Sequence, residues 1–184
     1  MKPIFAAVIG AAGLALSGLV QASSLDLNLG SDAVQFEAAG EVANGVRLGG
    51  GVLHSEYRED ATVYHAQLMG GEHTRDHEVG VGMRWTQYDT DYGDGGGLGL
   101  GGYAYVSLPN MSRVSLGGYG FYTPSAVTSS DLDDGYEIGA RARYAFTPNV
   151  DGYVGVRQLS ADFDTSSGSS RLDRSAQVGV RLHF

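Results

Sequence analysis

The chain lacks cysteine altogether, which excludes disulfide bonds and thiolate chemistry. Proline is scarce as well, with 4 residues among 184, whereas glycine reaches 29. Abundant glycine suits a sheet with many bends and close backbone contacts. It argues against a helical bundle, because each interior glycine costs a helix about 1 kcal/mol. The composition therefore favours a single β-sheet domain.

Positive charge is also in short supply, since 12 Lys and Arg stand against 21 Asp and Glu, for a net charge of -9. Such a chain gains no counterion release from nucleic acid, so nucleic acid is not expected as a partner. Aromatic residues make up 10% of the chain, which is too many for a disordered protein of this composition. A folded protein with some other partner is expected.

A long apolar run occurs at the start of the chain, within residues 1–22. Lys2 supplies a positive charge, the residues from Ile4 to Val20 are apolar or small, and Ala22 ends a small-residue recognition site. We interpret residues 1–22 as a cleaved secretory signal peptide and residues 23–184 as the remaining domain. A membrane-anchoring helix is the weaker alternative, because the run has only about 17 residues and no stop-transfer charges follow it.

The rest of the chain alternates with a period of two, which is typical of strands with two unlike faces. Gln177, Gly179, Arg181 and His183, for example, alternate with apolar residues at the end of the chain. Ten such segments can be counted: residues 24–29, 32–42, 46–57, 61–69, 76–88, 97–108, 112–123, 134–147, 150–162 and 171–184. Around Gly49–Gly51 the sequence does not indicate which face of the strand each residue occupies, and we allow a β-bulge there.

Two features favour a transmembrane β-barrel over a soluble sandwich. First, the polar faces carry full charges of both signs, which we expect to face the lumen: Glu37, Arg47, Glu78, Arg84, Arg113, Glu137, Arg141, Arg143, Arg157 and Arg181. Second, aromatic residues gather near strand ends, as in the girdles of membrane barrels. They are Trp85, Tyr88, Tyr122 and Tyr136 at one end, and Tyr144, Phe146 and Phe184 at the other.

The turns indicate an up-and-down topology. Asn44-Gly45, Pro109-Asn110 and Pro148-Asn149 predict tight turns. Longer polar loops are expected at about 55–60, 88–97, 123–134 and 162–171, so short and long connections mostly alternate, as in outer-membrane barrels. The connection from Leu68 to Asp76 is the exception, because it is not tight. The predicted fold is an all-β, antiparallel barrel of about ten strands, with eight strands and an N-terminal hairpin as the alternative.

Both ends of the domain then suggest a family. The last strand ends in Val178, Val180, Leu182 and Phe184, which resembles the terminal signal that the barrel-assembly machinery reads in outer-membrane proteins. The stretch from Ser24 to Gln35 resembles the start of the mature YfaZ proteins, a family of bacterial outer-membrane barrels. The resemblance implies the outer membrane as location, with lipid and lipopolysaccharide as surroundings, and the predicted signal peptide implies export through the general secretory pathway. It implies no catalytic residues and no oligomeric state.

The predicted lumen charges have two readings. They could line a narrow pore, helped by the space that inward glycines leave: Gly80, Gly82, Gly99, Gly101, Gly117, Gly139, Gly155 and Gly179. Alternatively, they are the polar filling of a small barrel, in which ion pairs satisfy one another.

Other polar groups carry less specific signals. Acidic residues gather in the predicted external loops, and the stretch from Asp89 to Asp94 weakly resembles a calcium loop but lacks its frame and closing glutamate. The histidines have no hydrolase motif around them, and His73 and His77 share no helical face. We therefore predict no metal, no cofactor and no enzymatic activity.

These observations leave three classes of function open. The leading hypothesis is a narrow channel or a structural component of the envelope. The second is a surface interaction protein whose acidic loops bind a partner or divalent cations. The third and weakest is an enzyme that modifies envelope lipids or peptides.

Overall fold

The computed structural model describes residues 22–57, 60–74, 76–90, 93–163 and 170–184. Ten long strands run through these residues: β1 (Ala22–Gly30), β2 (Ala33–Ala43), β3 (Val46–Ser55), β4 (Ala61–His73), β5 (His77–Thr90), β6 (Gly93–Leu108), β7 (Met111–Thr123), β9 (Leu132–Thr147), β10 (Val150–Phe163) and β11 (Ser170–His183). A short 3-10 turn, η1 (Ser125–Val127), and the short strand β8 (Thr128–Ser130) lie between β7 and β9. No helix in the described ranges is long and apolar enough to cross a membrane.

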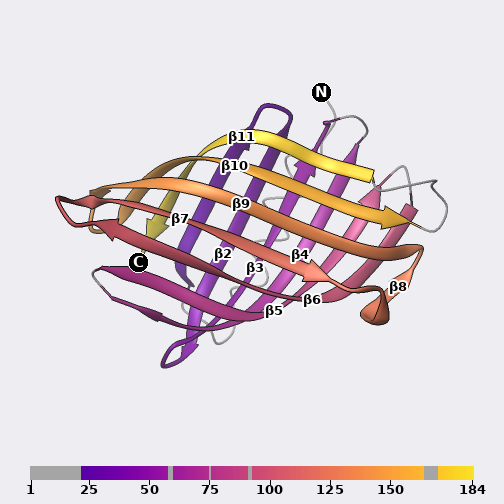
Figure 1. The fold of residues 1–184 in the computed structure, drawn as a ribbon, viewed down its shortest axis with the longest axis horizontal. Helices are drawn as coiled ribbons and strands as arrows, with labels where there is room; N and C mark the ends of the chain where they lie inside the picture. Colours follow the sequence, from indigo (N-terminus) through magenta and orange to yellow (C-terminus); the bar gives the residue numbers. More distant parts are fainter. Residues whose placement is uncertain (1–21, 58–59, 75, 91–92, 164–169) are drawn as a thin grey trace.

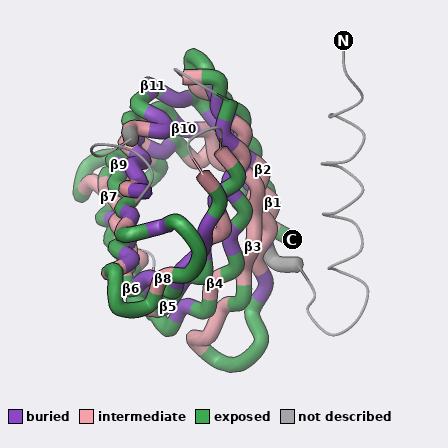
Figure 2. The backbone as a smooth tube through the Cα atoms, turned by 90° about the vertical axis from the view of Figure 1, so that its right-hand side faces the viewer, coloured by how far each residue is buried: buried purple, intermediate pink, exposed green. Residues whose placement is uncertain are grey.

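The ten long strands form a closed antiparallel barrel (Figures 1 and 2). Closure depends on β1, which pairs with β2 on one side and with β11 on the other. The ten-strand prediction is confirmed, and the alternative of eight strands with a separate hairpin is wrong. A closed barrel leaves no sheet edge with unpaired backbone groups, which is what a β-protein in lipid requires.

The barrel has two unlike ends. At the turn end, the connections β2–β3, β4–β5, β6–β7 and β9–β10 are turns of two or three residues, and β1 begins and β11 ends there. At the loop end lie the other five connections, including η1 and β8 (Figure 1). The exception expected at Leu68–Asp76 is wrong, because β4 extends to His73. Thr74 then closes a short turn by accepting a hydrogen bond from the His77 backbone N–H at 3.1 Å.

Two other local predictions are wrong. The loop expected at 88–97 is mostly strand, because Gly95–Gly97 pair with β5 on one side and β8 on the other. A Cβ atom at Gly97 would lie 2.5 Å from the Thr123 side chain, so glycine permits this close packing. The bulge expected at Gly49–Gly51 is absent, since these residues pair in continuous register with β2 and β4. The irregularity in the β2–β3 ladder lies between Glu41 and Ala43 instead.

The outer wall of the barrel is apolar. Val81, Leu100 and Val154 are 73%, 66% and 59% exposed, and aliphatic side chains on the other strands share this outward face. Exposed apolar surface on this scale marks contact with another apolar phase, which for a closed barrel is the lipid of a membrane. Most of the predicted aromatic girdle is exposed on this wall: Trp85, Tyr122, Tyr136, Tyr144, Phe146 and Phe184.

The prediction that Tyr88 belongs to the aromatic girdle is wrong. Its side chain is only 2% exposed, because Tyr88 shares the parity of the inward-facing Arg84 and not that of Trp85. Its ring packs edge-on against Phe163 inside the barrel, with ring centroids 6.4 Å apart.

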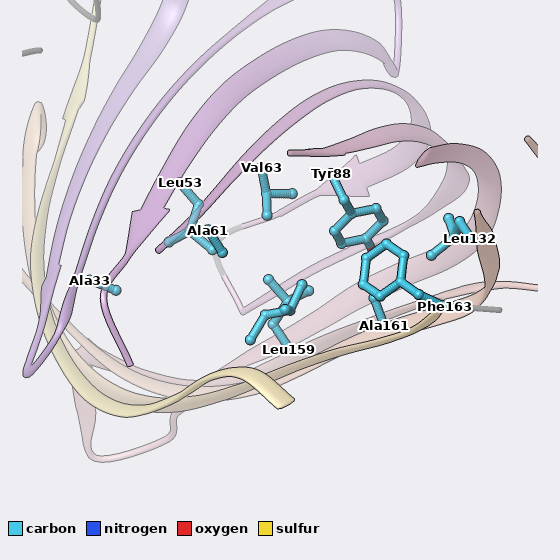
Figure 3. Close-up of a cluster of buried hydrophobic side chains, with 10 residues drawn as sticks. Ala33, Leu53, Ala61, Val63, Tyr88, Leu132, Leu159, Ala161 and Phe163 are labelled. Atoms are coloured by element: carbon cyan, nitrogen blue, oxygen red, sulfur yellow. The ribbon is translucent and has the colours of Figure 1, made fainter. Parts of the chain in front are cut away.

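A cluster of ten buried apolar residues lies at the loop end of the interior (Figure 3), whereas the buried Met69, Tyr105, Phe121 and Tyr153 lie outside it. We call this cluster the loop-end plug, and its members are Ala33, Leu53, Ala61, Val63, Tyr88, Leu132, Leu159, Ala161, Phe163 and Leu172. Each comes from the part of its strand that lies nearest the loop end. The interior therefore has an apolar layer at one end and a polar layer beneath it.

Candidate functional site

A polar cavity of about 70 Å³ lies inside the barrel, between the loop-end plug and the turn end. That volume holds on the order of five water molecules. Of the ten predicted lumen residues, eight line it: Glu37, Arg47, Glu78, Arg84, Glu137, Arg141, Arg143 and Arg181. Arg157 lies beside the plug and is buried, whereas Arg113 is exposed near the β6–β7 turn and does not line the cavity.

Two carboxylates are shared by four arginines in the part of the cavity nearest the turn end. Arg143 Nη1 lies 2.7 Å from Glu78 Oε2, and Arg47 Nη1 lies 3.4 Å from the other oxygen of Glu78. The two guanidinium groups of Arg47 and Arg143 therefore share the single negative charge of Glu78.

Asp26 occupies the equivalent position for the other two arginines. Arg181 Nε lies 2.8 Å from Asp26 Oδ2, and Arg141 Nη1 lies 3.8 Å from the same oxygen. Asp26 was missing from the predicted lumen set, although its alternation with Leu25 and Leu27 placed it on a polar face. That alternation was the available signal.

The middle of the cavity holds a network of ion pairs and hydrogen bonds between charged and amide side chains. Arg84 Nη1 lies 2.7 Å from Glu137 Oε2, and the same arginine donates from Nε and Nη2 to Gln67 Oε1 at 3.0 and 2.7 Å. Gln67 in turn donates to Glu37, whose second oxygen lies 3.4 Å from His65 Nε2. The network links β2, β4, β5 and β9 across the barrel.

Inward tyrosines fill the space above inward glycines on neighbouring strands. Tyr103 covers Gly80, Tyr119 covers Gly139 and Tyr153 covers Gly179, each pair being directly opposed in register. A Cβ atom at any of these glycines would fall within 2.6 Å of the opposing ring.

Arginines then stack on the inward rings. The guanidinium carbon of Arg143 lies 3.2 Å from the centroid of Tyr105, and that of Arg141 lies 4.9 and 4.6 Å from those of Tyr119 and Tyr153. Such stacking stabilises a cation without neutralising its charge. Gly80, Gly139 and Gly179 thus accommodate aromatic rings, and the space directly above these three glycines is filled.

Access to the interior increases towards the turn end. The side chains of Arg157 and Asp173, which form an ion pair beside the plug, are 0% exposed, whereas Arg47 is 30% exposed. The loop-end plug lies beyond the loop-end limit of the cavity, and none of the plug residues lines it.

The predicted loop acids lie mainly at the loop end. Among the described ones, Asp89, Asp94, Asp131 and Asp133 are exposed. Glu59, Asp91 and Asp164 lie outside the described residues. Within the described ranges, no group of three His, Asp or Glu side chains is placed to hold a metal ion.

Comparison with known proteins gives a family and a fold. A family model described as YfaZ precursor matches residues 1–184. The outer membrane protease OmpT from Escherichia coli has a similar structure, with a TM-score of 0.56, 10% identity, and coverage of 89% of this chain and 94% of OmpT. A KdgM porin has a TM-score of 0.48 and 11% identity, with coverage of 89% of this chain and 99% of the porin. The outer membrane channel DcaP of Acinetobacter baumannii has a TM-score of 0.44 and 10% identity, with coverage of 86% of this chain and 54% of DcaP. No curated protein sequence matches. At this identity the OmpT likeness shows a shared outer-membrane barrel fold and nothing about activity.

Proposed function

The chain belongs to the YfaZ precursor family, and from that premise we propose that it is a narrow outer-membrane channel for small ions, held closed by the loop-end plug. The observation that supports a channel is the charged cavity, which reaches the partly exposed Arg47 near the turn end and lies on the turn-end side of the loop-end plug. Hydrophobic constrictions gate channels by excluding water. Displacement of the plug would join the cavity to the loop end.

Export through the general secretory pathway belongs to the same proposal. The signal peptide predicted at residues 1–22 lies outside the described residues, except for Ala22 at the start of β1. The proposed role needs no catalytic residue and no cofactor. A structural barrel with a permanently closed lumen is the alternative.

Conductance after removal of the plug aromatics tests the channel. We expect the double variant Tyr88→Ala, Phe163→Ala to open several-fold more often in planar bilayers than the wild type, because the variant removes the edge-on ring pair from the apolar layer. The matched control is Tyr144→Ala, Phe146→Ala, which removes an edge-on pair from the lipid-facing wall. If wild type and plug variant are both silent in bilayers while folded, the channel proposal fails and the structural alternative stands.

We also propose that Val178, Val180, Leu182 and Phe184 are read by the barrel-assembly machinery. All four are exposed on the outer wall, and Phe184 is 70% exposed. Phe184→Ala should lower the amount of folded protein in the outer membrane several-fold, because it removes a recognised group without disturbing the interior. Heat-modifiable gel mobility of membrane fractions measures this. Phe146→Ala is the control, and an equal loss in both variants would reduce the effect to a general loss of apolar surface.

A further inference from the structure

The cavity carries unbalanced positive charge near the turn end. Among the described residues, four arginines there form ion pairs with two acids, Asp26 and Glu78; the arginines are Arg47, Arg141, Arg143 and Arg181. The remaining acids of the lining lie in the middle layer, where Glu137 is paired with Arg84. Glu37 accepts a hydrogen bond from Gln67 and lies 3.4 Å from His65 Nε2. Asp151 on β10 does not line the cavity, and its carboxylate lies 2.8 Å from His183 Nε2. The cavity lining therefore holds five arginines against four acids, so one positive charge is left without a carboxylate.

The arginines are also close to one another. Arg141 and Arg181 approach the same oxygen of Asp26, and Arg47 and Arg143 approach the two oxygens of Glu78, so the like charges of each pair repel. The side chains of Arg141 and Arg143 are only 8% and 10% exposed, so water screens this repulsion weakly. Convergence of like charges in a buried space is unfavourable unless an anion joins them.

Arg141 has unused hydrogen-bonding capacity. A guanidinium has five N–H donors, yet among the described residues Arg141 has the 3.8 Å ion pair to Asp26 and two aromatic rings as its contacts. Its buried Nε has no hydrogen-bond partner, and neither does the Nε of Arg143. Buried charged donors that lack partners are rare in folded proteins, and each one points to a missing acceptor.

We propose that this arginine cluster binds a small oxyanion that enters from the turn end. A phosphate or carboxylate group supplies the acceptors that Arg141 and Arg143 lack, and arginine forks match its geometry. The cavity volume of about 70 Å³ admits one such group. Binding of this kind requires no ion flow, so the oxyanion site can be tested independently of the proposed channel.

Two lining variants with opposite expected effects test the site. The protein is purified from outer membranes in detergent, and inorganic phosphate binding is measured by calorimetry and by the rise in unfolding temperature. Arg141→Gln should weaken phosphate binding by about tenfold or more, because it removes a buried charge and its unpaired donors. Glu78→Gln should tighten binding and enlarge the phosphate-induced rise, because it frees Arg47 and Arg143 from their shared carboxylate.

Arg113→Gln is the matched control, since it makes the same charge change at an exposed residue outside the cavity. Its phosphate affinity should equal that of the wild type. Equal loss in Arg113→Gln and Arg141→Gln would mean surface charge attraction and overturn the site, as would an absence of saturable binding to wild type. If heat-modifiable gel mobility shows that Arg141→Gln does not fold, the test rests on Glu78→Gln. Tighter phosphate binding in that variant then supports the site, and unchanged binding overturns it. Conductance measured in phosphate-free chloride keeps the channel test separate.

Discussion

Arg157→Met should destabilise the barrel by about 3–5 kcal/mol, the loss typical when one partner of a buried ion pair is removed. Arg157 Nε lies 2.6 Å from Asp173 Oδ2, and both side chains are 0% exposed. The same arginine donates to Gln35, so three strands meet at this group. Methionine keeps the apolar length of the side chain but leaves the Asp173 carboxylate buried beside Ser175 without a counterion.

Unfolding by urea in lipid vesicles provides the measurement. The single tryptophan, Trp85, is 44% exposed on the lipid-facing wall, so its fluorescence reports loss of insertion. The double variant Arg157→Met, Asp173→Leu should recover most of the stability, because an apolar pair of similar volume often replaces a buried ion pair at little cost. Arg113→Met, at an exposed position, should change stability by no more than about 0.5 kcal/mol. A loss below about 1 kcal/mol in Arg157→Met would contradict the burial of this pair.

The wall of the barrel was predictable from sequence because lipid outside and a polar lumen inside impose a strict period of two. Ala176 to Phe184 is an example, since its apolar members are outward and Gln177 and Gly179 are buried inside. The same rule allowed ten strands to be counted. Its main failures occurred where glycine lacks a hydrophobic signature, as in Gly93–Gly97, which the sequence presented as a loop.

The contents of the lumen were less predictable, because alternation gives the face of a residue and not its partner or its depth along the axis. Arg113 and Arg157 share the inward parity of the cavity residues, yet one is exposed near a turn and the other is buried beside the plug. Ion pairs such as Arg84 with Glu137 join residues 53 positions apart, and a local pattern cannot encode that separation. The inward glycines were misinterpreted for a related reason, since tyrosines from neighbouring strands take the space at Gly80, Gly139 and Gly179.

Those tyrosine–glycine pairs predict the second large effect, at Gly179. A Cβ atom there would lie 2.3 Å from Cζ of Tyr153 and 2.7 Å from the backbone oxygen of Leu27. The Tyr153 hydroxyl is held by Asp26, to which it donates a hydrogen bond, and by Asn28, which donates to it, so the ring has no free direction in which to move. Any side chain at Gly179 must displace both a fixed ring and the β1 backbone at the strand pair that closes the barrel.

Gly179→Val should therefore lower the free energy of unfolding by about 4 kcal/mol, combining roughly 1–3 kcal/mol from overpacking with roughly 1–3 kcal/mol from the polar groups left unsatisfied when Tyr153 moves. Urea unfolding in vesicles, followed through Trp85, measures the loss. Gly120→Ala is the control, because its Cβ would meet no heavy atom closer than 3.7 Å, so its stability should match or exceed that of the wild type. A Gly179→Val barrel as stable as the control would mean that β1 and β11 are not locked together by the Tyr153 ring. The closure of the barrel would then depend on the backbone ladder alone.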